Sequence, residues 1–122
     1  MRVSGAESLV MEALWRHGSA TAEEVIADVG PEQAWSETTV KTLLGRLLKK
    51  KAVSAERDGR RYVYRPLIAR EDYVQSESQN LIDRLFGGRV APLVSHFSER
   101  EKLTREDIAE LKRLIAEIDD DR

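Results

Sequence analysis

Cysteine is absent from this chain of 122 residues. Its absence excludes disulfide bonds, thiolate metal sites and a thiol nucleophile. Histidine occurs only as His17 and His96, without the spacing typical of a metal site. Apolar runs extend over only a few residues, whereas a membrane span needs about 20. The first residues show no apolar stretch followed by a cleavage site. We therefore expect a cytoplasmic protein that is not an enzyme and uses no metal, cofactor or small-molecule substrate.

An overall excess of positive charge is also missing, since the formal net charge is −2. The charges are unevenly distributed, however. Between Lys41 and Arg65 there are nine basic residues and only two acidic ones, Glu56 and Asp58. Residues 71–122 instead hold eight basic and 13 acidic residues. A concentrated basic stretch on a mildly acidic chain is typical of a DNA-facing surface, although a solvated charged helix face gives the same pattern.

Two capping boxes predict two helices near the start of the chain. The first box is Ser4–Glu7, and His17-Gly18 ends its helix. The apolar face of this helix is predicted to carry Leu9, Val10, Ala13 and Leu14. The second box is Thr21–Glu24, and Gly30-Pro31 is predicted to break its helix. Its apolar stripe is Val25, Ile26 and Val29.

A third helix is predicted after the capping residue Ser36. Its apolar residues recur at helical spacing: Val40, Leu43, Leu44, Leu47 and Leu48. Its other face is polar and basic, with Glu37, Thr38, Lys41, Thr42, Gly45, Arg46 and Lys49. Three short helices in tandem, the third amphipathic and basic, indicate a helix-turn-helix core. Trp15 and Trp35 are interpreted as packing residues.

A β-hairpin is predicted directly after this basic helix. Val53–Arg57 and Arg60–Arg65 alternate like strands, Asp58-Gly59 is a tight-turn signal, and Pro66 ends the second strand. A hairpin in this place is a wing. Its arginines are Arg57, Arg60 and Arg61, which are predicted to contact the phosphate backbone of DNA. The alternative is a surface hairpin whose arginines serve solubility.

The remaining chain is predicted to form three more helices. They are Arg70–Phe86, closed by Gly87-Gly88, then Val90–Phe97, and a last helix capped by Thr104. The last helix carries Ile108, Leu111, Ile115 and Ile118 in the spacing of a partner-helix stripe. Three helices in about 50 residues cannot bury much core alone, so we expect a homodimer. The predicted dimerisation residues are Leu81, Leu85, Phe86, Leu93, Phe97, Leu111 and Ile115. The terminal aspartates 119–121 are interpreted as a frayed charged end.

The predicted fold is therefore mainly α with a small β-hairpin wing. A winged helix-turn-helix DNA-binding domain is expected over residues 1–69 and a helical dimerisation domain over 70–122. The third helix is predicted to enter the major groove. The residues expected to face the bases are Thr38, Lys41, Thr42 and Arg46. Thr39 and Lys49 are expected to hold phosphates.

Four segments together resemble the penicillinase and methicillin-resistance repressors, the BlaI/MecI group. They are Trp35–Lys51 (WSETTVKTLLGRLLKKK), Glu12–Trp15 (EALW), Arg61–Leu67 (RYVYRPL) and Glu71–Val74 (EDYV). The resemblance extends from about residue 6 to residue 118. It implies a repressor that binds a palindromic operator through its N-terminal domain, dimerises through its C-terminal helices and controls β-lactamase or other antibiotic-resistance genes.

The resemblance also implies a regulatory route. In this group a membrane-bound sensor metalloprotease triggers inactivation by cleavage in the C-terminal region, just before a phenylalanine. The matching bond here is His96-Phe97, where His96 stands in place of the usual Asn. A simpler interpretation makes Phe97 a core residue of the dimer and His96 its exposed neighbour, and the two interpretations are compatible. A copper-responsive branch carries a C-terminal cysteine cluster, which this chain lacks.

Two features of the third helix depart from expectation. Glu37 places a carboxylate near its DNA-facing end, and Gly45 leaves a gap in the reading face. The alternative function is a winged helix that binds proteins and does not bind DNA. The basic helix face and the arginine-flanked turn argue against it, and steep salt dependence of duplex binding would separate the two.

Overall fold

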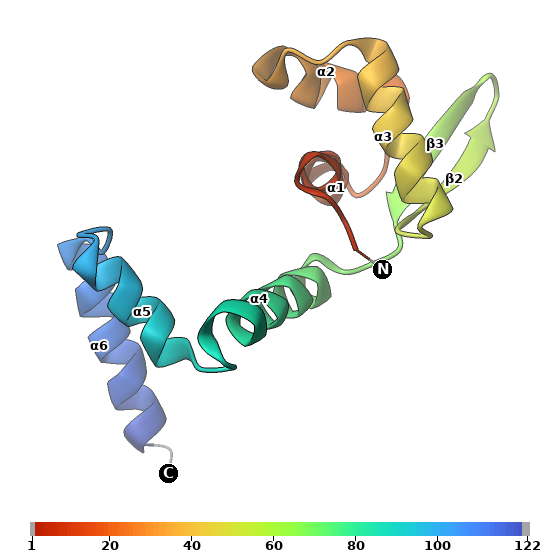
Figure 1. Cartoon of the computed structure of the whole chain (residues 1–122). Helices are drawn as coiled ribbons and strands as arrows, with labels where there is room; N and C mark the ends of the chain where they lie inside the picture. The colour runs from red at the N-terminus through yellow and green to blue at the C-terminus, as the bar shows by residue number, and fades with distance from the viewer. Residues whose placement is uncertain (1, 121–122) are drawn as a thin grey trace. The chain divides into compact units, whose positions relative to one another are not determined.

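The computed structural model of the chain describes residues 2–120 and contains, over these residues, six helices and three strands. The chain divides into two compact units, Met1–Val74 and Gln75–Arg122 (Figure 1). The first unit holds three helices, the sheet and the first turn of a fourth helix, and the second contains only helices and their connecting turns in its described part. A mainly helical chain with a small sheet confirms the predicted fold class.

Helix α1 (Gly5–His17) begins at the predicted capping box and ends at Gly18, whose φ of 80° suits glycine. The Ser4 hydroxyl accepts from the Glu7 N–H at 3.1 Å, and the Glu7 carboxylate accepts from the Ser4 N–H at 2.8 Å. The placement of Leu9 on the buried face is wrong, since Leu9 is 37% exposed. Glu7 starts the buried row instead, followed at helical spacing by Val10, Met11 and Leu14.

Helix α2 (Ala22–Gln33) begins at the second capping box and continues through the predicted break. Pro31 lies inside its last turn, where the missing N–H removes only one hydrogen bond. Gly30 has no Cβ to clash with the proline ring, so the helical conformation before Pro31 is tolerated. The helix ends at Ala34, which adopts a left-handed φ of 56°. Val25 and Val29 are buried and Ile26 is half-buried.

Helix α3 (Glu37–Lys49) begins where predicted, with the Ser36 hydroxyl accepting from the Thr39 N–H at 3.2 Å. Its buried residues are Val40, Leu43, Leu44 and Leu47. The prediction that Leu48 belongs to the apolar stripe is wrong, since Leu48 is 36% exposed. Four buried residues at i, i+3, i+4 and i+7 already fill the core-facing row, and the next residue turns away from it.

Three antiparallel strands form a small sheet in the order β1-β3-β2. Strands β2 (Val53–Asp58) and β3 (Arg61–Pro66) make the predicted hairpin, which stands beside α3 (Figure 1). Strand β1 (Ala20–Thr21) pairs with β3 and is too short to show alternation in the sequence. Asp58 pairs with Arg61, so the turn is Gly59-Arg60, one residue later than predicted. Gly59 has φ +66°, as expected for glycine at the first central position.

The hydrophobic core of the first unit lies between α1, α2, α3 and the sheet. Trp15 and Trp35 pack partly buried against it, which confirms their interpretation as packing residues. The Trp15 indole Nε1 donates to the Ile68 carbonyl at 2.9 Å. The Trp15 ring also lies 5.3 Å from the ring of Tyr73, measured between centroids. This tertiary packing fixes the three helices and the hairpin as one body.

The later helices are α4 (Arg70–Phe86), α5 (Val90–Glu99) and α6 (Arg105–Asp120). Helix α5 extends two residues beyond its predicted end, and Gly87 and Gly88 have φ of 59° and 80° after α4. The Thr104 hydroxyl caps α6 by accepting from the Asp107 N–H at 3.0 Å. Residue 121 of the terminal aspartate run lies outside the described residues. None of the residues described in these three helices is buried.

No helix within residues 2–120 has the length and apolar character required to cross a membrane. The same residues contain no group of three or more His, Asp or Glu side chains arranged to hold a metal ion.

Candidate nucleic-acid interface

Helix α3 separates its core-facing side chains from its exposed side chains. All six residues of this helix that were predicted to contact DNA are exposed: Thr38, Thr39, Lys41, Thr42, Arg46 and Lys49. The Thr39 hydroxyl also lies 3.1 Å from the Ser36 hydroxyl, so it takes part in the helix cap. The helix therefore presents hydroxyl and cationic donors on one continuous surface.

Short side chains occupy the middle of this surface until the last turn of the helix. At about 3.6 residues per turn, Thr38, Thr42 and Gly45 lie near its centre, followed by Lys49 in the last turn, while Lys41 and Arg46 lie on opposite flanks. A Cβ built at Gly45 would meet no other group within 4 Å, so the position is open to solvent. The part of this surface before Lys49, with short side chains between Lys41 and Arg46, can approach a base-pair edge closely.

Lys41 is paired within the helix. Its Nζ lies 2.8 Å from Glu37 Oε1, four residues earlier. The hydrogen bond from Lys41 lowers the pKa of Glu37, and the same bond raises the pKa of Lys41, so both groups are charged at neutral pH. No ion pair among residues 2–120 involves Arg46. The two flanks of the surface therefore differ in their net charge.

The wing arginines surround the end of the hairpin. Arg57 pairs with Tyr62 and Asp58 with Arg61. Directly paired residues share a face and neighbours alternate, so Arg57 and Arg61 lie on opposite faces of the sheet. Arg60 lies in the turn itself. All three arginines are exposed, although Arg57 Nε donates to the Gly59 carbonyl at 3.1 Å.

Lys50 belongs to the basic stretch of the sequence, but its side chain contacts residues at the start of the chain. Its Nζ donates to Glu7 Oε1 at 2.5 Å and to the Arg2 carbonyl at 2.8 Å. Burial of Glu7 favours its neutral form, but the bonds from Lys50 and Ser4 outweigh this effect and lower its pKa. The ion pair between Lys50 and Glu7 links the end of α3 to the start of α1. In the sequence, only the presence of a glutamate on the core-facing side of α1 indicates such a contact.

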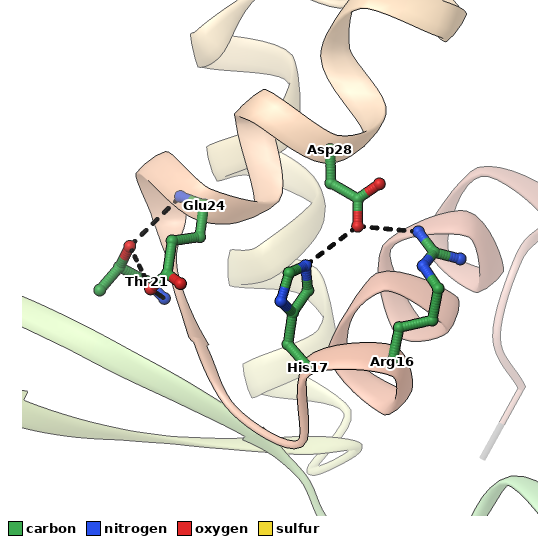
Figure 2. A network of polar contacts seen from close by, with 5 residues as sticks. All are labelled: Arg16, His17, Thr21, Glu24 and Asp28. Carbon is green, nitrogen blue, oxygen red and sulfur yellow. Dashed lines mark hydrogen bonds and ion pairs between the residues drawn. The ribbon is translucent and has the colours of Figure 1, made fainter.

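A second polar network joins α1 to α2 (Figure 2). Asp28 Oδ2 accepts from Arg16 at 2.8 Å and lies 3.1 Å from His17 Nε2, and the Arg16 bond lowers the pKa of Asp28. At the start of α2, Glu24 Oε1 lies 3.1 Å from both the backbone nitrogen and the hydroxyl of Thr21, and the backbone bond lowers the Glu24 pKa. These contacts hold α2 in place, and α2 packs on α3.

The predicted dimerisation residues lie on α4, α5 and α6. Leu81, Leu85, Phe97 and Ile115 are exposed, whereas Phe86, Leu93 and Leu111 are half-buried. Three of the seven line a groove between α5 and α6: Leu93, Phe97 and Leu111. Ile108 and Ile118 of the α6 stripe are also exposed, at 41% and 59%. The second unit therefore leaves much apolar surface uncovered.

The predicted cleavage bond lies inside α5. His96 and Phe97 are both exposed, with their ring centroids 5.6 Å apart, and the His96 ring lies 6.3 Å from that of Phe86. Both carbonyls accept hydrogen bonds at the helix end, from Arg100 and Lys102 respectively. A protease would have to unwind this turn to reach the bond.

Comparison with known proteins decides the family. A family model described as penicillinase repressor matches residues 3–117. The chain belongs to the penicillinase repressor family. This membership confirms the resemblance found in the sequence, and because the family consists of transcriptional repressors, it also confirms that the chain is not an enzyme.

Among relatives within the penicillinase repressor family, a penicillinase repressor of Bacillus licheniformis is 35% identical over 95% of this chain and 91% of its own length. The methicillin resistance regulatory protein MecI of Mammaliicoccus sciuri is 31% identical over 93% of this chain and 92% of its own. A solution structure of monomeric Bacillus licheniformis BlaI in complex with the blaP half-operator has a TM-score of 0.54 and 40% identity. It covers 60% of this chain and 89% of that one.

Proposed function

We propose that this chain represses transcription by binding a palindromic operator as a homodimer. The observation that carries the proposal is the exposed face of α3, which lies opposite a fully buried apolar row. A relative 40% identical over 60% of this chain has been studied on a half-operator, which supports the same use of this domain. Thr38, Lys41, Thr42 and Arg46 would face base edges in the major groove.

The phosphate backbone would be held from two elements. Thr39 and Lys49 of α3 would contact phosphates beside the groove, and the wing would place Arg57, Arg60 and Arg61 against the backbone. Such contacts fix position and orientation without reading sequence. The Arg57 side chain would first release the Gly59 carbonyl, to which it donates in the absence of DNA.

Homodimerisation would use the second half of the chain, residues 70–122, and leave residues 1–69 to bind DNA. The support is the set of exposed apolar side chains on α4, α5 and α6, together with the absence of buried residues in their described part. Covering such a surface with a second copy removes apolar area from water, the dominant favourable term in association. Two linked winged helices would then match the symmetry of a palindrome.

The regulated genes would be β-lactamase or other antibiotic-resistance genes, as the names of the relatives suggest. We propose that a membrane-bound sensor metalloprotease relieves repression by causing cleavage between His96 and Phe97. The cut would separate α6 and the end of α5 from the other predicted dimerisation residues without altering α3. Because the repressor must meet its operator, the proposal keeps the cytoplasmic location predicted from the sequence.

Selection from a pool of random duplexes tests DNA binding. We expect an inverted repeat to be enriched and its affinity to fall steeply with salt, because each contacted phosphate contributes about −0.9 to the slope of log affinity against log salt. Failure to enrich any motif, with no salt-dependent duplex binding, would indicate the protein-interaction module instead.

Mass spectrometry of the repressor recovered from cells exposed to a β-lactam tests the proteolytic step. We expect a fragment that ends at His96, appearing together with expression of the repressed gene. Expression of that gene while the chain stays intact would exclude cleavage as the signal.

A further inference from the structure

Glu37 is an anion on a surface that otherwise offers cations and hydroxyls to DNA. It lies in the first turn of α3 and its side chain is 62% exposed. Glu37 is not part of the hydrophobic core, and its contribution to the fold is the small favourable interaction of a first-turn carboxylate with the helix dipole. Its only ion pair within residues 2–120 is with Lys41, a residue proposed to face the bases.

The ion pair reduces the positive charge on one flank of α3. Lys41 is hydrogen-bonded to Glu37, and Glu23 of α2 also acts on it electrostatically. Arg46, on the opposite flank, has no such partner in the described part of the chain. A random duplex approaching this helix would meet a full charge at Arg46 and a compensated charge at Lys41.

The carboxylate itself tolerates few neighbours in the major groove. Phosphates repel it, and the O6 and N7 atoms of guanine and the O4 atom of thymine are acceptors that cannot pair with it. The amino group of cytosine is the donor that carboxylates recognise in this groove. The N6 amino group of adenine is the other donor in the groove, but the N7 acceptor beside it repels a carboxylate, so cytosine is the base that Glu37 pairs with best.

We propose that Glu37 is a specificity-determining residue, which pairs with Lys41 in the free protein and accepts a hydrogen bond from a cytosine amino group in the operator. This inference rests on the proposed function. On a duplex that lacks the cytosine, the carboxylate is desolvated without its preferred donor. Lys41 then has to break its ion pair with Glu37 before it can bind the DNA. The pair thus weakens binding to wrong sequences more than it strengthens binding to the right one.

The test compares wild type with Glu37→Gln on two duplexes, the selected operator and a random sequence of equal length. The control is Glu99→Gln, an exposed residue of α5 whose substitution changes the net charge equally. For Glu37→Gln we expect the ratio of specific to random affinity to fall by roughly 10- to 100-fold, the size of one good base contact. The salt slope on random duplex should steepen by about 0.9, because Lys41 becomes free to neutralise one phosphate.

Selection from random duplexes should also show relaxed preference at one cytosine position for each half-site with Glu37→Gln and not with Glu99→Gln. An unchanged affinity ratio, with the same enriched motif, would overturn the inference while leaving the proposed function in place. If wild type itself enriches no motif, the proposed function fails first. Circular dichroism melting of each variant shows that the comparison is made between folded proteins.

Discussion

Arg46, like Lys49, is a cation of α3 that forms no ion pair within residues 2–120. It is exposed on the flank opposite Lys41, and no carboxylate of residues 2–120 forms an ion pair with it. Its guanidinium can therefore bind a guanine edge without first breaking an internal contact. By contrast, Lys50 in the same basic stretch is committed to Glu7. A count of charges in the sequence does not distinguish Arg46 from Lys50. The difference between them appears only in the structure, where Lys50 has an acidic neighbour and Arg46 forms no ion pair within residues 2–120.

Replacing Arg46 by Ala should lower operator affinity by roughly 1–3 kcal/mol, the scale of one good base contact. The measurement is a titration of labelled operator by gel shift or fluorescence anisotropy. Lys112→Ala, which removes an exposed cation from α6, should leave the affinity within about twofold. Equal affinities for wild type and Arg46→Ala would contradict the placement of α3 in the groove.

Glu7 is expected to make the free energy of unfolding depend on pH in the acidic range. Its pKa in the folded protein lies below its ordinary value, because the bonds from Lys50 and Ser4 outweigh the effect of burial. A carboxylate with a lowered folded pKa contributes stability above its unfolded pKa of about 4.3, and this is lost as pH falls through the folded value. Urea unfolding between pH 7 and pH 3 should show a drop below about pH 4 that is smaller in Glu7→Gln. A variant with the same acid drop as wild type would contradict this role.

At the scale of elements, the end of α3 contains a residue in an unfavourable conformation. Lys51 has a φ of 63°, and the chain closes the helix around it through bonds from the Lys51 N–H to the Leu48 carbonyl and from the Ala52 N–H to the Leu47 carbonyl. This is the left-handed helix end that glycine usually occupies. A side chain there costs about 1–2 kcal/mol, part of which the greater freedom of unfolded glycine offsets.

Lys51→Gly should therefore raise the free energy of unfolding by about 1 kcal/mol. Thermal or urea unfolding measures the change. Lys51→Ala removes the same charge but keeps the strained backbone, so it should give no comparable gain. Equal stabilisation by Gly and Ala would show that charge, and not backbone strain, governs this position.

Most elements of the first unit were predictable because their signals are local. Hydroxyl caps at Ser4, Thr21 and Ser36 mark the starts of three helices, and glycine at the hairpin marks the turn. The predicted elements differ from the structure where the conformation of a segment depends on another residue or on a distant strand. Pro31 is tolerated because of Gly30, and strand β1 exists only because β3 lies beside it.

The candidate site was less predictable than the fold. The exposed positions of α3 follow from its period, so Thr38, Lys41, Thr42, Arg46 and Lys49 are exposed as the pattern predicts, and Thr39, which lay outside the predicted polar face, is exposed as well. The ion pair between Glu37 and Lys41 has a signal in the sequence, since Glu four residues before Lys is the favoured spacing on a helix. The hydrogen bond from Arg57 to the Gly59 carbonyl has none, because it depends on the rotamer of Arg57 and the geometry of the turn. Those two contacts are the ones that distinguish the free protein from the proposed bound state.

At the scale of the whole molecule, the chain joins a unit with a buried core to one whose described residues, up to residue 120, include no buried side chain. A chain that ends at Val74 keeps the core and the Trp15–Tyr73 contact but loses the exposed leucines and isoleucines of α4 to α6. We expect it to sediment as a monomer while the full chain sediments as a dimer. Its affinity for a full operator should fall by about 100-fold or more, because linkage no longer raises the effective concentration of the second half-site. If the shortened chain still sedimented as a dimer, the dimer interface would have to lie in the first unit.

The central claim is that two copies of α3 read one operator together. Hydroxyl-radical footprinting of the full chain on the selected duplex tests this claim most directly. We predict two protected regions on one face of the DNA, with centres separated by one helical turn of about 10 base pairs or a multiple of it. Arg46→Ala should weaken both regions equally. A single protected region at saturating protein, or protection without preference for the selected sequence, would contradict the account.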